Sequence, residues 1–165
     1  EIILLKKTLR IPLCNKAVFL YVNAIILTNI QYFQTVNTMP QMFIDYSDNI
    51  QNLDKKKLML GLNHALFDTG LVGHAHDIKS RIQSVSDYLI GFGDESGEQS
   101  NQAFIFVRLQ GLSGRTEPQK DLMTENLSQF LQSFEDYSAQ GLEIQLCVEF
   151  AEMPREIYKK VFVQK

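Results

Sequence analysis

The residues in this sequence whose types and spacing could do chemistry are a small group of cations. Lys79 and Arg81 stand two positions apart in a stretch with strand character, so their side chains point the same way. Arg115 stands just before an expected helix, where unpaired backbone N–H groups and the helix dipole favour an anion. Together these cations hint at a carboxylate-binding site. The alternative is that they are solvated or paired with surface acids.

Other motifs that would indicate a cofactor or a metal are missing from the sequence. The nine glycines contain no phosphate loop, nucleophile elbow or dinucleotide fingerprint. His74 and His76 are separated by one residue, and His64 is the only other histidine. A zinc site needs three or four converging ligands, so we expect solvated histidines. The sequence therefore shows no motif for a nucleotide cofactor, and we expect no metal site.

Length and charge limit the possible partners. The chain has 165 residues and a net charge of −3, which suits one domain and leaves no basic footprint for nucleic acid. No apolar run reaches the ~20 residues that span a bilayer, so we expect no membrane partner. Cys14 and Cys147 are too few for a disulfide framework. We expect two reduced thiols in a cytoplasmic protein.

The first 39 residues differ from the rest. Residues 1–39 carry a net charge of +3, which leaves −6 for residues 40–165. The apolar stretch 17–27 faintly resembles a signal peptide, but a polar residue interrupts it and no cleavage site follows. The sequence does not begin with Met, whereas Met39 stands directly before Pro40. We expect 1–39 to be upstream translation or a non-native leader; a packed helical extension and an export signal are the alternatives.

From residue 40 onward, strand and helix patterns alternate. A β-type run at 41–46 is followed by turn formers and then by leucines at helical spacing. Asp54 is the expected N-cap of this helix, and Gly70 marks its end. The next segment, 78–89, alternates as a strand does. The polar stretch 91–101 is expected to be a loop.

The second half repeats this order. Residues 103–109 form a nearly continuous apolar strand, of the kind that is covered on both faces. Thr116 and Gln119 form a capping-box signature, and apolar residues at helical spacing carry the helix on to Gly141. Residues 142–150 then alternate between apolar and polar, which predicts a strand with one solvated face.

Two strand–helix–strand units predict an α/β (α+β) fold. Right-handed crossovers place both helices on one face of a four-stranded sheet. The other face would expose a large apolar patch in a single chain. We therefore expect a homo-oligomer that associates through sheet faces and edges.

Several segments carry a family resemblance. They resemble the 5-carboxymethyl-2-hydroxymuconate Δ-isomerase family of the tautomerase superfamily over 40–165, and not over 1–39. The segments are PQMFIDYSDNI at 40–50, FDTG at 67–70, IKSR at 78–81, AFIFVRLQGLSGRT at 103–116 and LEIQLCVEF at 142–150.

This resemblance implies a homotrimer of β-α-β repeats that isomerises an unsaturated di- or tricarboxylic acid in aromatic catabolism without a cofactor. It assigns the catalytic base to Pro40, after the preceding methionine is removed, and substrate binding to Lys79 and Arg115. Arg81 is a possible second cation. The family usually has arginine where this chain has Lys79, and lysine keeps the charge but loses the planar bidentate fork.

The implied chemistry has one strict requirement. An α-amino group titrates near pH ~8, and an apolar pocket beside cations lowers that value toward neutrality. The amine of a terminal Pro40 can then take a proton from one carbon and return it to another, while Arg115 and Lys79 hold the negative charge. If Pro40 is joined to Met39, its nitrogen is an amide and cannot act as a base.

Two other functions remain open at this point. A tautomerase-fold enzyme could use the same base on a different enol acid, and Lys79 would mark that change. A non-catalytic trimeric binding protein would result if residues 1–39 are retained.

Overall fold

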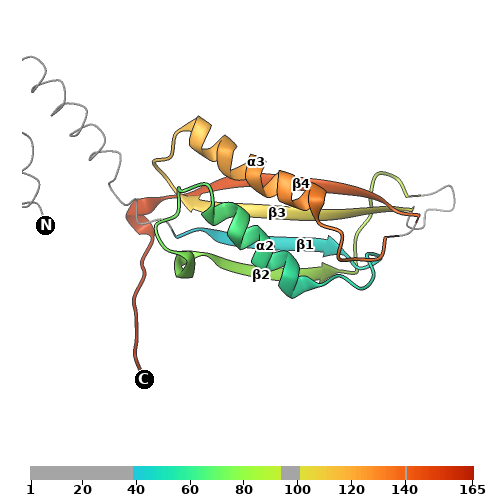
Figure 1. Ribbon diagram of the computed structural model, residues 1–165, viewed down its shortest axis with the longest axis horizontal. Helices are drawn as coiled ribbons and strands as arrows, with labels where there is room; N and C mark the ends of the chain where they lie inside the picture. Colours follow the sequence, from blue (N-terminus) through green and yellow to red (C-terminus); the bar gives the residue numbers. More distant parts are fainter. Residues whose placement is uncertain (1–38, 94–100, 140) are drawn as a thin grey trace, which may run out of the picture. The chain divides into compact units, whose positions relative to one another are not determined.

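The computed structural model describes residues 39–93, 101–139 and 141–165, so the expected leader lies outside the described residues except for Met39. These residues belong to a unit that extends to Lys165. Figure 1 shows its elements along the chain: β1 (Gln41–Ser47), α2 (Lys55–Phe67), η2 (Ala75–Asp77), β2 (Lys79–Val85), β3 (Gln102–Leu112), α3 (Glu117–Ser133), β4 (Glu143–Met153) and η3 (Arg155–Ile157). Within the described ranges, no helix is both long and apolar enough to cross a membrane.

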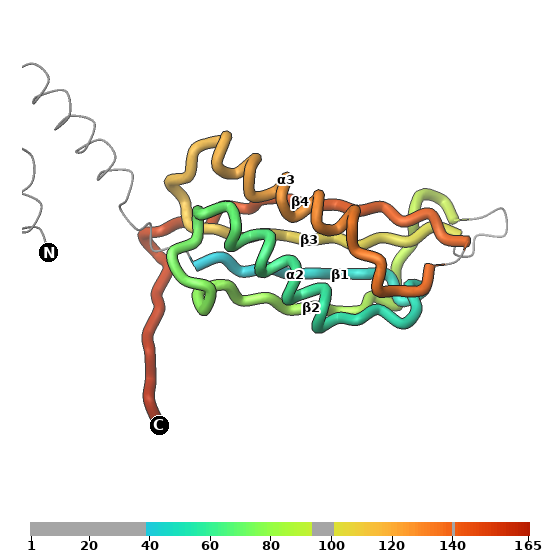
Figure 2. The backbone as a smooth tube through the Cα atoms, in the orientation of Figure 1, coloured from blue at the N-terminus to red at the C-terminus, as the bar shows by residue number. Residues whose placement is uncertain are grey.

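The four strands form one mixed sheet in the order β2-β1-β3-β4. β1 is parallel to β2 and β3 is parallel to β4, while the central pair, β1 and β3, is antiparallel. Each parallel pair is joined through a helix, and α2 and α3 lie side by side on the same face of the sheet (Figures 1 and 2). The predicted architecture of two β-α-β units is confirmed.

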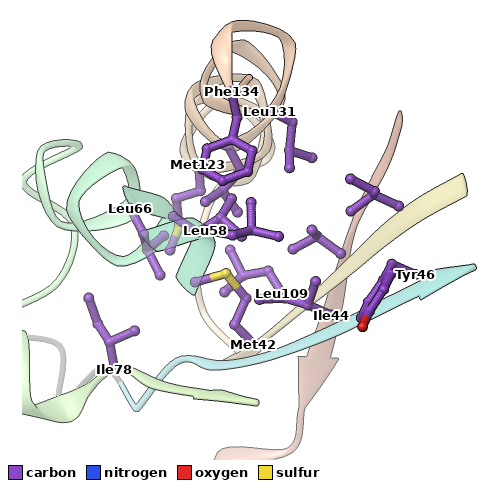
Figure 3. Packing of buried hydrophobic residues seen from close by; sticks show 14 of the residues in the cluster. Met42, Ile44, Tyr46, Leu58, Leu66, Ile78, Leu109, Met123, Leu131 and Phe134 are labelled. Atoms are coloured by element: carbon purple, nitrogen blue, oxygen red, sulfur yellow. The ribbon is translucent and has the colours of Figure 1, made fainter. Parts of the chain in front are cut away.

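The core lies between the two helices and this face of the sheet. Alternate residues of β1 and β3 point into it, because successive side chains of a strand face opposite ways. Each helix adds three residues one or two turns apart, which are fully or almost fully buried. Burial stabilises the fold by about 2 kcal/mol for each such side chain. Figure 3 shows this cluster, which includes Met42, Ile44, Leu58, Leu66, Leu109, Met123 and Leu131.

The ends of both helices follow local sequence signals in part. Asp54 caps α2, because its side chain accepts a hydrogen bond from the backbone of Lys57 at 2.9 Å. Thr116 and Gln119 form the predicted capping box at the start of α3. Between the helices, a methyl group on Gly61 would overlap the ring of Phe130, so the glycine allows α2 and α3 to approach closely.

Two element ends differ from the prediction because tertiary pairing sets them. β2 ends at Val85 rather than continuing to 89, since its one partner, β1, ends at Ser47, which pairs with Val85. α3 ends at Ser133 rather than near Gly141. The backbone of Phe134 is extended, and the chain beyond it forms a bridge between Ser138 and Gln51.

Two strands are longer than predicted, and the predicted loop is described only in part. β3 and β4 run past the predicted ends, to Leu112 and Met153. Part of the expected loop 91–101, namely residues 94–100, lies outside the described residues. The described part begins with a turn in which Gly91 and Gly93 both have positive φ.

The sheet face opposite the helices is the open face. Phe43, Phe104 and Phe106 lie there at strand positions that alternate with the buried core positions, and each is half-buried. The prediction that β3 is covered on both faces is therefore not met within one chain. These aromatic side chains are available for association with another copy.

The C-terminal segment is joined to the turn before β2 by one ion pair. Lys160 donates a hydrogen bond from Nζ to Oδ1 of Asp77 at 2.6 Å, and Asp77 is only 4% exposed. This hydrogen bond, the largest favourable influence, holds the pKa of Asp77 below its ordinary 3.8 despite burial.

We predict that Asp77→Asn lowers the free energy of unfolding at pH 7 by about 1 kcal/mol, because it removes one partner of a charged hydrogen bond. The pKa of Asp77 is lower in the folded state, so its contribution is present above pH 3.8 and is lost as the pH falls through the folded value. Urea unfolding at a series of pH values should show wild type and Asp77→Asn converging in acid. The exposed Asp87→Asn is the control, and a pH-independent difference for Asp77→Asn would contradict the prediction.

Candidate functional site

The pairing of the strands brings four chain segments to one end of the sheet. β1 and β2 begin at this end because they are parallel, and β3 and β4 finish there because β3 is antiparallel to β1. The residues before β1, at the start of β2 and after β3 are Pro40, Lys79 and Arg115. Figure 2 shows these strand ends together, and the positions of the three candidate residues along the chain place all of them at this end of the sheet.

Pro40 is fully buried at the start of the central strand β1. Its carbonyl oxygen accepts a hydrogen bond from the backbone N–H of Lys79 at 3.1 Å, which ties the starts of β1 and β2 together. Met39, directly before it, is 3% exposed. In this chain the Pro40 nitrogen is therefore a buried peptide nitrogen without a basic lone pair.

The loop after β3 carries Arg115, at the end of the sheet where β1 begins. Gln41 pairs with Gln110, so Pro40 and Gly111 are next in the same register. A Cβ atom on Gly111 would stand 2.7 Å from Nη1 of Arg115, so the guanidinium lies directly over this glycine. Gly111 thus provides the space that the guanidinium of Arg115 occupies at this end of β3.

Arg115 is a buried cation with unsatisfied hydrogen-bonding capacity. Arg115 is 8% exposed, and its Nη1 donates a hydrogen bond to the carbonyl oxygen of Leu112 at 2.8 Å. Nη2 is buried and has no hydrogen-bond partner among the described residues. The guanidinium carbon lies 5.7 Å from the centre of the Phe150 ring. A buried charge without a partner is costly, so this arrangement favours binding of an anion.

The pKa of Arg115 reflects this environment. Burial is the largest influence and lowers the pKa, and the nearby positive charge of Arg155 lowers it further. Glu152 offsets part of this effect. Because a guanidinium does not lose its proton in proteins, the consequence is an energetically unfavourable cation rather than a neutral side chain.

Lys79 lies on the other face of the sheet. It pairs with Gln41 in the parallel register, and Gln41 alternates with the buried Met42, so both side chains belong to the open face. Lys79 is exposed, and its Nζ donates to the carbonyl oxygen of Asp77 at 3.3 Å. One chain therefore places Lys79 and Arg115, the two predicted substrate-binding cations, on opposite faces.

Arg81 is also on the open face, two residues further along β2. Its Nη2 donates to Oε1 of Gln41 at 2.7 Å, and its guanidinium carbon lies 4.0 Å from the centre of the Phe43 ring. Lys79 and Arg81 share a face, as their spacing predicted. Arg81 already has partners within the chain, whereas Arg115 has an unused donor.

Sequence reasoning missed a second cation near Arg115. Arg155 follows β4, and its Nε and Nη2 donate to the carbonyl oxygen of Ser113 at 3.3 and 3.1 Å. β4 is parallel to β3, so its end had to lie at the same end of the sheet. The prediction ended this strand at residue 150, and extending it would have drawn attention to Arg155.

The two histidines that are separated by one residue lie in the turn before β2. His74 and His76 stack on each other, with ring centroids 5.2 Å apart, in the turn before β2. Across residues 39–93, 101–139 and 141–165, no group of three or more His, Cys, Asp or Glu side chains is arranged to hold a metal ion.

The model of one protein family matches this part of the chain. The family is described as 5-carboxymethyl-2-hydroxymuconate isomerase, and the match covers residues 40–164. It begins at Pro40, the first residue of the candidate site. None of the curated protein sequences matches this chain.

Solved structures with the same fold include two named as isomerases. A 5-carboxymethyl-2-hydroxymuconate isomerase from Deinococcus radiodurans R1 is 21% identical with a TM-score of 0.60, covering 77% of this chain and 92% of its own. A 5-carboxymethyl-2-hydroxymuconate delta-isomerase is 21% identical with a TM-score of 0.63, covering 81% and 92%. A fused 4-OT asymmetric trimer is 18% identical with a TM-score of 0.54, covering 73% and 91%. At these identities the likeness shows the fold.

We predict that Gly111→Ala disrupts the candidate site. The added methyl group would stand 2.7 Å from both Nη1 of Arg115 and the Phe150 ring, so both side chains, or the backbone of residue 111, must move. Overpacking of this kind costs about 1–3 kcal/mol, which urea unfolding would measure. Gly73→Ala is the matched control, because its methyl group would meet nothing within 4 Å. Equal stability of the two variants would contradict the close packing described for Arg115.

Proposed function

Because this chain belongs to the 5-carboxymethyl-2-hydroxymuconate isomerase family, we propose that it is a cofactor-free isomerase of an unsaturated enol acid. The substrate is a di- or tricarboxylic acid such as 5-carboxymethyl-2-hydroxymuconate, an intermediate of aromatic catabolism. One observation carries the proposal: the buried Arg115 has an unused donor and lies over Gly111, which follows in the strand register opposite Pro40, where the family match begins.

Pro40 acts as the base when it is the first residue of the mature protein. Its nitrogen is then a secondary amine, which titrates near pH ~8 before the site perturbs it. Burial and the neighbouring charge of Arg115 both disfavour the protonated amine and lower its pKa toward neutrality. A usable fraction of the amine is then unprotonated at neutral pH, as general base catalysis requires.

The reaction itself is a transfer of one proton between two carbons. The amine nitrogen takes a proton from the substrate, and the electron pair of the broken bond shifts through the conjugated system toward oxygen. Arg115 stabilises the negative charge that develops there. The nitrogen then returns the proton to the other carbon, so the double bond moves and no oxidant or reductant is consumed.

Lys79 can contribute to substrate binding in an assembly of several copies. Within one chain it lies on the open face, together with the half-buried aromatic residues that another copy would cover. We propose a homotrimer formed through this face and the sheet edges, as the name of one similar structure describes for a 4-OT protein. Lys79 then lies where copies meet and offers its charge to a substrate carboxylate.

The proposed location is the cytoplasm. Cys147 is an exposed free thiol within the described residues, and two cysteines are too few for a disulfide framework of the kind that secreted proteins carry.

Two alternatives rest on specific observations. Lys79 replaces the arginine that is usual in the family, so a different enol acid is the first alternative substrate. The second alternative is a non-catalytic binding protein, which the buried peptide bond between Met39 and Pro40 favours if residues 1–39 are retained.

We predict that only a protein that begins at Pro40 transfers the proton. The full chain and the chain starting at residue 40 would be compared on an enol-acid substrate by following its ultraviolet absorbance. In the active form, kcat/KM should rise with pH as the amine loses its proton, because the unprotonated amine is the base. A full chain that retains 1–39 and turns over the acid equally fast would refute Pro40 as the base.

Two substitutions separate the base from the binding residue. Pro40→Ala, in the chain that starts at residue 40, should lower kcat by about 10²–10⁴ because a primary amine replaces the positioned base. Arg115→Ala should weaken binding of the acid at least about tenfold, since a buried charge contact is lost. Lys57→Gln, which removes an exposed ion pair with Asp136, is the control. Equal effects of all three variants would contradict both roles.

A further inference from the structure

Arg115 and Arg155 are fixed to the same short loop by adjacent peptide carbonyls. Nη1 of Arg115 donates to the carbonyl oxygen of Leu112, and Nε and Nη2 of Arg155 donate to that of Ser113. The backbone N–H of Arg155 also donates to Oγ of Ser113 at 3.3 Å. Both guanidinium groups are therefore held at the Leu112–Ser113 segment, and the charge of Arg155 lowers the pKa of Arg115.

Neither arginine forms an ion pair within the described ranges. The nearest acid that acts on Arg115, Glu152, is already bound by Nζ of Lys120 at 3.0 Å. Nη2 of Arg115 has no partner among the described residues, and no hydrogen bond from Nη1 of Arg155 is formed there either. Two like charges held by one loop, with unused donors and no ion pair to an acid in the described part of the chain, form a site for an anion.

We propose that Arg155 is a specificity-determining residue that holds, together with Arg115, one carboxylate of a dicarboxylic substrate. This inference rests on the proposed function for the class of substrate. Arg115 binds the carboxylate from the buried side, and the exposed Arg155 binds it from the solvent side. The pair supplies the planar donors that Lys79 cannot, so the second carboxylate of a diacid is recognised on the helix side of the sheet.

A purely structural role is the competing explanation, because Arg155 already holds the carbonyl of Ser113. The two roles differ in their dependence on charge. Glutamine retains a donor for this carbonyl but has no charge, while lysine keeps the charge without the fork. If Arg155 binds an anion, affinity should fall in the order Arg, Lys, Gln at this position. If Arg155 only holds the carbonyl of Ser113, affinity has no reason to follow the charge.

The test uses the chain that starts at Pro40 and cis,cis-muconate, a diacid that cannot undergo the reaction. Calorimetry should show that Arg155→Gln weakens binding about tenfold, a loss typical of one charged contact, and that Arg155→Lys restores part of it. The affinity of Arg155→Gln should also depend less on salt. Lys159→Gln, which removes an exposed charge from the same segment, is the control and should change affinity less than about twofold.

A double variant tests whether the two arginines hold the same carboxylate. The loss in Arg115→Ala combined with Arg155→Gln should be smaller than the product of the two single losses, because each contact needs the other. Three results would overturn the proposal. The unsubstituted protein does not bind muconate, or Arg155→Gln binds it with unchanged affinity. The third result is an equal loss of affinity in Arg155→Lys and Arg155→Gln together with a lower unfolding temperature. Muconate binding without turnover of an enol acid would instead refute the isomerase function and leave this site standing.

Discussion

The antiparallel pairing of β1 with β3 is the constraint on which the rest of the structure depends. It joins two β-α-β units so that both strand starts of the first unit and both strand ends of the second lie at one end of the sheet. Pro40 and Gly111 become neighbours in this register, and Arg115 follows within one loop. A shift by one residue would turn every side chain of β1 to the other face and expose its core residues. The hydrophobic core therefore fixes the geometry of the site.

This geometry keeps a charge in an unfavourable place. Arg115 is buried, its pKa is lowered by that burial, and it has one donor without a partner among the described residues. The core beneath the helices supplies the free energy that maintains this arrangement. In the proposed function, a substrate carboxylate gives this guanidinium a charged hydrogen bond in a low-dielectric setting, which offsets the cost of its burial. The position of the Arg115 guanidinium requires glycine at position 111, because a side chain there would occupy the same space.

Periodicity predicted the elements well, and long-range contacts decided what it missed. The four strands, two helices and the caps at Asp54 and Thr116 follow from local patterns. The end of β2 depends on where β1 stops, and the end of α3 depends on a bridge to a distant segment. Spacing placed Lys79 and Arg81 on one face correctly, but only the register shows that Arg115 lies on the other. Arg155 has no motif around it, and only the length and direction of β4 bring it to the same loop as Arg115.

The position of Lys79 links assembly to substrate binding in the proposed trimer. Lys79 and Arg81 share the open face with Phe43 and its aromatic neighbours on β3. Covering these rings with another copy is favourable, but it also removes water from the cation of Lys79, which is costly unless an anion accompanies it. A bound carboxylate meets that need. By linkage, a ligand that binds only the assembled form stabilises it, so an acid that contacts Lys79 at the junction strengthens the trimer as well.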